Sequence, residues 1–272
     1  MSTRLRSILV TAVASISFLL LQLLDFNLSA EAGILESLLR SLIISFIVFI
    51  GIYWVVNFKI KIDRVLPILT FPALLIFVIS FFAELIIFTS LDGAGEIGFL
   101  IASAIVLSVF VYVAVLTANI LNVSVASKIP LGQAGRAAQY VLVLLASYLG
   151  FFILFSVGLI VFIRLPAIFL FTLFLSYSSF WTIELKNKES VLSSLILSFI
   201  VLFAATVLVI WPLSVGYVSL MLSMIMYMGL GVGLEIREKI TGYVWVEYSL
   251  LFIVMIIIAL LFASFGINGT LL

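Results

Sequence analysis

The sequence predicts an all-α fold, a polytopic bundle of about nine transmembrane helices, on the basis of three observations. Hydrophobic residues make up 66% of the 272 residues and charged residues only 9%, whereas a soluble domain carries about 25% charged residues. The apolar residues come in runs of about 18 or more, the length that a helix needs to cross a bilayer. Basic residues gather on alternate connections between these runs. A soluble, disordered or disulfide-stabilised protein is excluded.

A helix needs about 20 residues to cross a hydrocarbon core of about 30 Å. Nine segments meet this requirement and form a single integral membrane domain over residues 1–272. In chain order they are Ser7–Leu24, Leu38–Asn57, Val65–Thr89, Ile97–Val125, Ala137–Ile163, Ala167–Glu184, Val191–Trp211, Leu213–Leu234 and Tyr243–Phe265.

The first segment is predicted to be a retained helix. Its apolar core of 18 residues is longer than the 7–15 residues of a signal peptide's apolar region. Pro67 and Pro72 make the third segment a candidate for a kink, because proline lacks the backbone N–H that a helix uses. The same property predicts turns at Arg164-Leu165-Pro166, between the fifth and sixth segments, and at Trp211-Pro212, between the seventh and eighth.

The basic residues predict the orientation of the chain, because short loops that carry lysine and arginine stay on the cytoplasmic side. A cytoplasmic N-terminus puts 11 of the 13 basic residues inside and leaves only Arg40 and Arg164 outside. With nine crossings the C-terminus then lies outside. All four tryptophans fall near the predicted membrane surfaces, where indole rings prefer to lie.

Small residues four positions apart let membrane helices approach each other closely. Such residues recur in several segments and predict packing stripes: Ala146, Gly150 and Gly158; Gly98 and Ala102; Ser190, Ser194 and Ser198; and Gly216, Ser219 and Ser223. Gly229, Gly231 and Gly233, at alternate positions, indicate either close packing or a loosened helix end. A hydrophilic path for a solute is the alternative interpretation of the serine stripes.

The residues that the chain lacks exclude several chemistries. Without histidine there is no serine–histidine dyad, and without cysteine or histidine there are no usual zinc or haem ligands. The three aspartates lie outside the apolar segments, which excludes an intramembrane aspartyl dyad. We expect no cofactor and no nucleic-acid partner, since there is no phosphate-binding loop and no basic run.

Ionisable residues inside membrane helices are costly and indicate function by default. Arg40, Glu84, Arg164 and Glu247 are the candidates. Glu84, between apolar neighbours near the outer end of its segment, is either an interfacial acid or a carboxylate that binds a proton or a cation, paired with Arg40 or Arg164. Asp92 and Glu96, in the next outer connection, are either solvated loop acids or, in an enzyme acting on lipid-linked sugars, a general base.

Asn119 and Asn122 share one helix face near the cytoplasmic end of the fourth segment, where their amides can bond a neighbouring helix or line an inward vestibule. They belong to the run Thr117, Asn119-Ile120, Asn122-Val123, Ile129-Pro130-Leu131 and Arg136-Ala137. This run resembles a family of hypothetical polytopic membrane proteins from small-genome bacterial lineages that has no assigned activity. The resemblance implies a bacterial cytoplasmic membrane and supplies no site residue.

Three functions are compatible with the sequence. The first is a non-enzymatic scaffold or complex subunit, with the lipid bilayer and other membrane proteins as partners. The second is a transporter of a small or amphiphilic solute, and the third is an enzyme acting on lipid or lipid-linked sugar. A cavity that reaches the midplane, and the side chains that line it, would distinguish among them.

Overall fold

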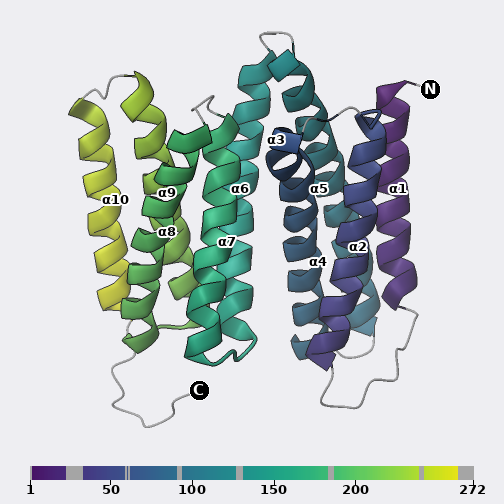
Figure 1. Ribbon diagram of the computed structural model, residues 1–272. Helices are drawn as coiled ribbons and strands as arrows, with labels where there is room; N and C mark the ends of the chain where they lie inside the picture. Colours follow the sequence, from purple (N-terminus) through teal and green to yellow (C-terminus); the bar gives the residue numbers. More distant parts are fainter. Residues whose placement is uncertain are drawn as a thin grey trace. The chain divides into compact units, whose positions relative to one another are not determined.

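The computed structural model describes residues 2–22, 33–58, 60, 62–90, 94–126, 131–182, 187–238 and 242–262. Over these residues the chain is all-helical, as the sequence predicts (Figure 1). The long helices are α1 (Thr3–Gln22), α2 (Gly33–Val55), α4 (Phe71–Ser90), α5 (Ala94–Ala126), α6 (Leu131–Ser156), α7 (Val161–Thr182), α8 (Asn187–Ile210), α9 (Val215–Glu238) and α10 (Gly242–Leu261). A short helix α3 (Ile62–Val65) and a π-helical turn η2 (Leu66–Thr70) precede α4.

Eight helical stretches in the described part of the chain are long and apolar enough to cross a membrane. They correspond to the first eight predicted segments, with the third formed by η2 and α4 together over Leu66–Ile86. In α10 the apolar stretch is shorter, Val246–Ile258. The polytopic helical fold is therefore confirmed, whereas a ninth crossing by α10 remains a prediction.

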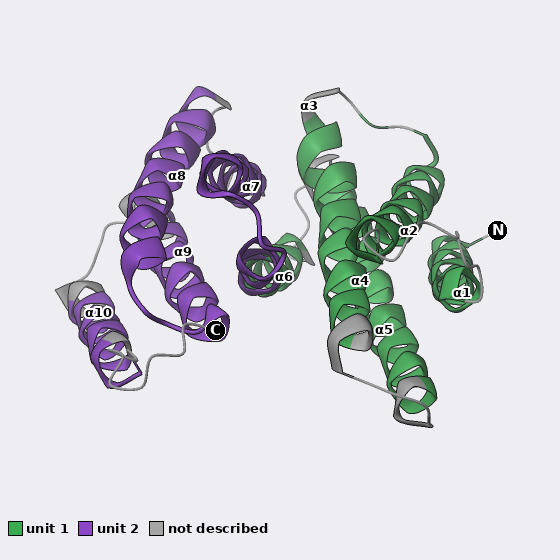
Figure 2. Cartoon of the chain, turned by 90° about the horizontal axis from the view of Figure 1, so that it is seen from below, with its two compact units in different colours: residues 1–146 green, residues 147–272 purple. Residues whose placement is uncertain are grey.

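The chain divides into two compact units, residues 1–146 and residues 147–272 (Figure 2). In the first unit α1 packs on α2 and α5, and α4 packs on α2 and α5. Hydroxyl groups bridge these helices: Ser15 and Ser108 lie 2.6 Å apart, oxygen to oxygen, and Ser45 donates to the carbonyl of Ala73 at 2.7 Å. Such polar contacts and close packing replace the hydrophobic effect as the force between helices in lipid. The expectation of a single membrane domain remains a prediction.

Arg6 connects the N-terminal end of α1 with the C-terminal end of α2. Its guanidinium donates to the side-chain oxygen of Asn57 and to the carbonyl of Trp54, and it lies 5.5 Å from the centroid of the Trp54 ring. Asn57 and Phe58 have φ of 59° and 57°, and this left-handed conformation is a common way to end a helix. The contact fixes one end of the α1–α2 pair.

In the second unit α7 packs closely on α8 through small side chains. Ser190, Ser194 and Ser198 are fully buried on α8, and Ser194 and Ser198 donate to carbonyls one turn back in their own helix. On α7, Ser176 approaches the carbonyl of Ser194 at 3.5 Å. The serine stripe of α8 is thus a helix-packing surface, and the solute-path interpretation is not supported for it.

The glycines of α9 also permit close packing. A Cβ atom on Gly229 would collide with Leu197 of α8, one on Gly231 with Tyr248 of α10, and one on Gly233 with Phe180 of α7. Three glycines at alternate positions therefore face three different helices, which confirms their interpretation as packing residues.

The connection between α6 and α7 corrects the sequence prediction. The break lies at Val157–Ile160, with Gly158 at φ +69°, and the sequence Arg164-Leu165-Pro166 is inside α7. Pro166 is the sixth residue of α7 and lacks the N–H that would bond the carbonyl of Phe162, four residues back, yet the helix continues through it. The predicted boundaries at Ile163 and Ala167 were wrong for this reason. The break after Trp211 is confirmed, since α8 ends at Ile210 and α9 begins at Val215.

Three glycines predicted to pack are not close to another helix. A Cβ on Gly98, Gly158 or Gly216 would meet nothing within 4 Å. The predicted pairing of Gly98 with Ala102 and the extension of two stripes to Gly158 and Gly216 were therefore wrong. The stripe that begins at Ala146 is confirmed only as far as Gly150, where a Cβ would overlap the ring of Phe171.

The predicted kink in the third segment takes the form of η2. Pro67 is inside this π-helical turn and Pro72 follows it, and the N–H of Phe71 bonds the carbonyl of Leu66, five residues back. A π turn widens the helix by one residue at a position where proline removes a normal helical bond. The result is a helix interrupted near one end, with an unbroken apolar part from Phe71 onwards.

Candidate functional site

The best candidate site is a network of four polar side chains at one end of the first unit. Gln22 is the last residue of α1, Glu36 and Arg40 lie in the first two turns of α2, and Glu84 lies in the second half of α4. These three helices lie together in the first unit (Figure 1). We call these four residues the Glu84 network.

Arg40 is at the centre of the Glu84 network. Its guanidinium forms an ion pair with Glu36 and donates to the side-chain oxygen of Gln22 at 3.0 Å. It also lies 3.6 Å from the Oε2 atom of Glu84. The amide of Gln22 donates to the Oε1 atom of Glu84. Gln22 therefore bonds both charged groups, accepting from Arg40 and donating to Glu84.

Burial makes this arrangement energetically important. Glu84 is only 3% exposed, and the exposed fractions of the Arg40 and Glu36 side chains are 14% and 15%. Burying an ionised carboxylate without a partner costs several kcal/mol. A partner of opposite charge offsets this cost only when the geometry is good and further hydrogen bonds form. The neighbours Phe81, Ala83 and Leu85 are buried and apolar. The positive charge of Arg40 and the amide of Gln22 compensate for the burial of Glu84.

The sequence predicted part of this network. Glu84 and Arg40 were candidates, and their pairing was one of two predicted alternatives; the structure brings them together. Gln22 and the role of Glu36 were missed. A glutamine inside a run of leucines indicates a buried polar partner, and the spacing of Glu36 and Arg40, four residues apart on one helix, indicates an ion pair. Both signals were present in the sequence.

Arg164, the other predicted partner of Glu84, makes contacts within the second unit. Its guanidinium donates to the carbonyl of Leu159 at 2.7 Å and lies 5.2 Å from the centroid of the Phe155 ring. Leu159 belongs to the turn between α6 and α7. Arg164 thus stabilises the turn between α6 and α7, which contains Gly158.

The remaining predicted residues are not part of the Glu84 network. Asn119 and Asn122 are half-buried on α5. Asp92 and the side chain of Glu96 lie outside the described residues. Glu247 is exposed on α10 and accepts a hydrogen bond from the Tyr227 hydroxyl at 3.2 Å.

The geometry favours a structural role for the network. Each of its charged groups has a partner within the unit, and it joins α1, α2 and α4 at the end opposite to the Arg6 contact. Among the described residues, no three acidic side chains are grouped closely enough to hold a metal ion.

Length and composition of the eight helices indicate a multi-pass membrane protein. Comparison with protein-family models, with curated proteins and with solved structures finds no match for this chain. The arguments for its function therefore come from its own residues.

Proposed function

We propose that this chain is a non-enzymatic scaffold, or a subunit of a membrane-protein complex, in a bacterial cytoplasmic membrane. The observation that carries the proposal is the internal pairing of the Glu84 network. A residue that acts on a solute needs an open face toward that solute. Glu84 instead directs one carboxylate oxygen to Gln22 and the other toward Arg40.

The hydroxyl groups of the second unit support the same proposal. Ser194, Ser198 and Ser219 donate to carbonyls one turn back in their own helices and are fully buried. Such hydroxyls allow helices to pack closely. Connections are also short, the longest being the 13 residues between the first two predicted segments. The described helices offer buried packing surfaces and exposed apolar faces as sites for contact with other membrane proteins.

Purification of the tagged chain from its own membranes in a mild detergent tests the proposal. We expect one or more membrane proteins to co-purify reproducibly in fixed ratio, and to be absent when a multi-pass protein of similar size and abundance is purified in parallel. Glu84→Gln, which removes the charge and keeps the size of the side chain, should retain the same partners. A monodisperse chain without partners contradicts the proposal.

A carrier for a small solute is the second candidate, and one observation favours it. Helix α4 holds the buried Glu84 and follows directly on the π-helical turn between Pro67 and Pro72. Interrupted helices that contain a buried charge occur in transporters. In a carrier Glu84→Gln should abolish solute uptake into vesicles, whereas in a scaffold it should leave the associated complex intact.

A further inference from the structure

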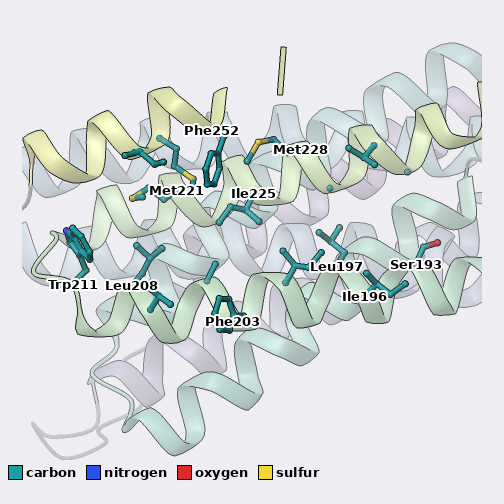
Figure 3. Close-up of a pocket in the computed structure, with 18 of the residues that line it drawn as sticks. Ser193, Ile196, Leu197, Phe203, Leu208, Trp211, Met221, Ile225, Met228 and Phe252 are labelled. Atoms are coloured by element: carbon teal, nitrogen blue, oxygen red, sulfur yellow. The ribbon is translucent and has the colours of Figure 1, made fainter. Parts of the chain in front are cut away.

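The second unit contains a long apolar cavity of about 750 Å³ between α8, α9 and α10 (Figure 3). Its walls come from α8 and α10 and its floor from α9, with Phe180 of α7 also in contact. Ser193 lies toward one end and Trp211 at the other. Every element involved belongs to the same unit.

The cavity runs along the direction in which the helices cross the membrane. Ser193 lies on α8 and Trp211 directly follows it; the two are 18 positions apart, or about 27 Å at about 1.5 Å per residue. This length approaches the hydrocarbon core of about 30 Å. The cavity therefore extends through most of the layer that acyl chains occupy.

The lining is apolar and laterally open. Ser193 is the only hydroxyl residue, and no lining residue is charged. Phe203 on α8 and Phe252 on α10 are 73% and 51% exposed, so the cavity opens between them toward the lipid. Met221, Met228 and Met255 contribute flexible side chains that adapt to irregular apolar shapes. Such a surface matches a flexible hydrocarbon chain and offers few bonds to a polar solute.

The shape of the cavity suits an acyl chain, because the cavity is long and its lining is apolar. A linear acyl chain is much thinner than a helix, which is about 10 Å across. Inside the cavity it contacts protein on several sides, which gives it more dispersion contacts than it has against a convex helix surface.

We propose that this cavity is a binding site for the acyl chain of a membrane phospholipid, which enters laterally between α8 and α10. The bound lipid fills the space that α10 leaves beside α8 and holds these two helices at a fixed separation. The inference is independent of the proposed scaffold function, because it concerns a lipid and not a protein partner.

The test counts the phospholipids that stay bound to the full chain. The protein is reconstituted in vesicles of phosphatidylglycerol, extracted in mild detergent and examined by native mass spectrometry. Wild type should keep about one phospholipid per chain. Ala204→Phe places a ring in the cavity, where Ala204 lines the wall, and should lower retention about tenfold, equivalent to about 1.4 kcal/mol.

Ala102→Phe is the matched control, since Ala102 is exposed on α5 in the first unit, and it should retain lipid as wild type does. If Ala204→Phe does not fold, as judged by gel filtration and circular dichroism, Ile225→Trp fills the cavity from α9. Wild-type retention in a folded cavity-filling variant, or no retained phospholipid in wild type, overturns the proposal.

Discussion

Arg40 and Glu84 depend on each other for their burial in the first unit, 3.6 Å apart. Removing one charge from a buried pair leaves the other uncompensated, which is more costly than removing both. We expect Arg40→Met to lower the free energy of unfolding by about 3 kcal/mol. Glu84→Gln should cost only about 1 kcal/mol, because Arg40 keeps its ion pair with Glu36 and the new amide needs no cation. Thermal unfolding in detergent, followed by circular dichroism, measures both.

The double variant Arg40→Met/Glu84→Leu is the control for this prediction. It removes both charges and fills their space with apolar groups, so its stability should be closer to wild type than that of Arg40→Met alone. If the losses in Arg40→Met and in the single variant Glu84→Leu simply add in the double variant, the pair is not coupled. The Glu84 network would then not stabilise the contact between α1, α2 and α4.

At the scale of single residues, the sequence was enough to identify Glu84 and Arg40, because an ionisable residue in an apolar run is conspicuous. It left open whether Arg40 or Arg164 is the partner, since a sequence shows the predicted depth of a residue but not which helices are neighbours. Gln22 lies 62 positions from Glu84, and the contact depends on α1 and α4 both packing beside α2. Spacing along one helix, as for Glu36 and Arg40, is the kind of contact that sequence can reveal.

Gly150 of α6 lies against the ring of Phe171 of α7. Replacing a helical glycine by alanine gains up to about 1 kcal/mol when the space is open, but a Cβ on Gly150 would overlap the ring of Phe171. Overpacking costs about 1–3 kcal/mol. We expect Gly150→Ala to lower the melting temperature and Gly98→Ala, whose Cβ would meet nothing within 4 Å, to raise it slightly. A rise in both would show that α6 and α7 separate without cost.

The turn between α6 and α7 depends on the left-handed backbone of Gly158. A side chain at φ +69° costs about 1–2 kcal/mol, and nothing lies within 4 Å that would obstruct it. Gly158→Ala should therefore destabilise the protein through the backbone alone. Gly216→Ala is the matched control, because its surroundings are equally open and its φ is not positive. Equal melting temperatures for the two variants would contradict this account.

The same turn shows why sequence reasoning located most breaks between helices but misplaced this one. Proline was taken as the breaker at Pro166, as it correctly was at Pro212. A membrane helix can also contain a proline, however, at the loss of one backbone hydrogen bond, and one residue does not reveal on which side of it the helix begins. Gly158 sits in an otherwise apolar run and resembles a packing glycine until its backbone conformation is known.

At the scale of the whole molecule, an apolar composition and the spacing of basic residues were sufficient to predict a multi-pass helical protein. The length of a hydrophobic run predicts the length of a membrane-spanning helix, since the thickness of the bilayer sets that length. Hydrophobic runs do not show which helices pack together. The division into two units and the cavity along α8 depend on the shapes of individual side chains, such as the glycines of α9 and the rings of Phe203 and Phe252.

The side of the membrane on which the C-terminus lies depends on whether α10 crosses. Its apolar stretch Val246–Ile258 is shorter than those of the other eight helices, yet the helix as a whole has 20 residues, Gly242–Leu261. At about 1.5 Å per residue this amounts to about 30 Å, enough for one crossing. The basic residues predict the side from which α10 starts, with Lys188 and Lys239 on the side of the N-terminus and the turn at Ser214 on the opposite side.

The absence of cysteine from the chain makes this prediction direct to test with single cysteines and a membrane-impermeant maleimide on intact cells. Ser214→Cys and Thr270→Cys should be labelled from outside, whereas Ser2→Cys and Lys188→Cys should react only after the membrane is permeabilised. Labelling of Ser214→Cys without Thr270→Cys would mean that α10 returns to the side from which it started. Because α10 forms one wall of the apolar cavity, such a result would also place part of that wall at the membrane surface, where an acyl chain would lose its contacts.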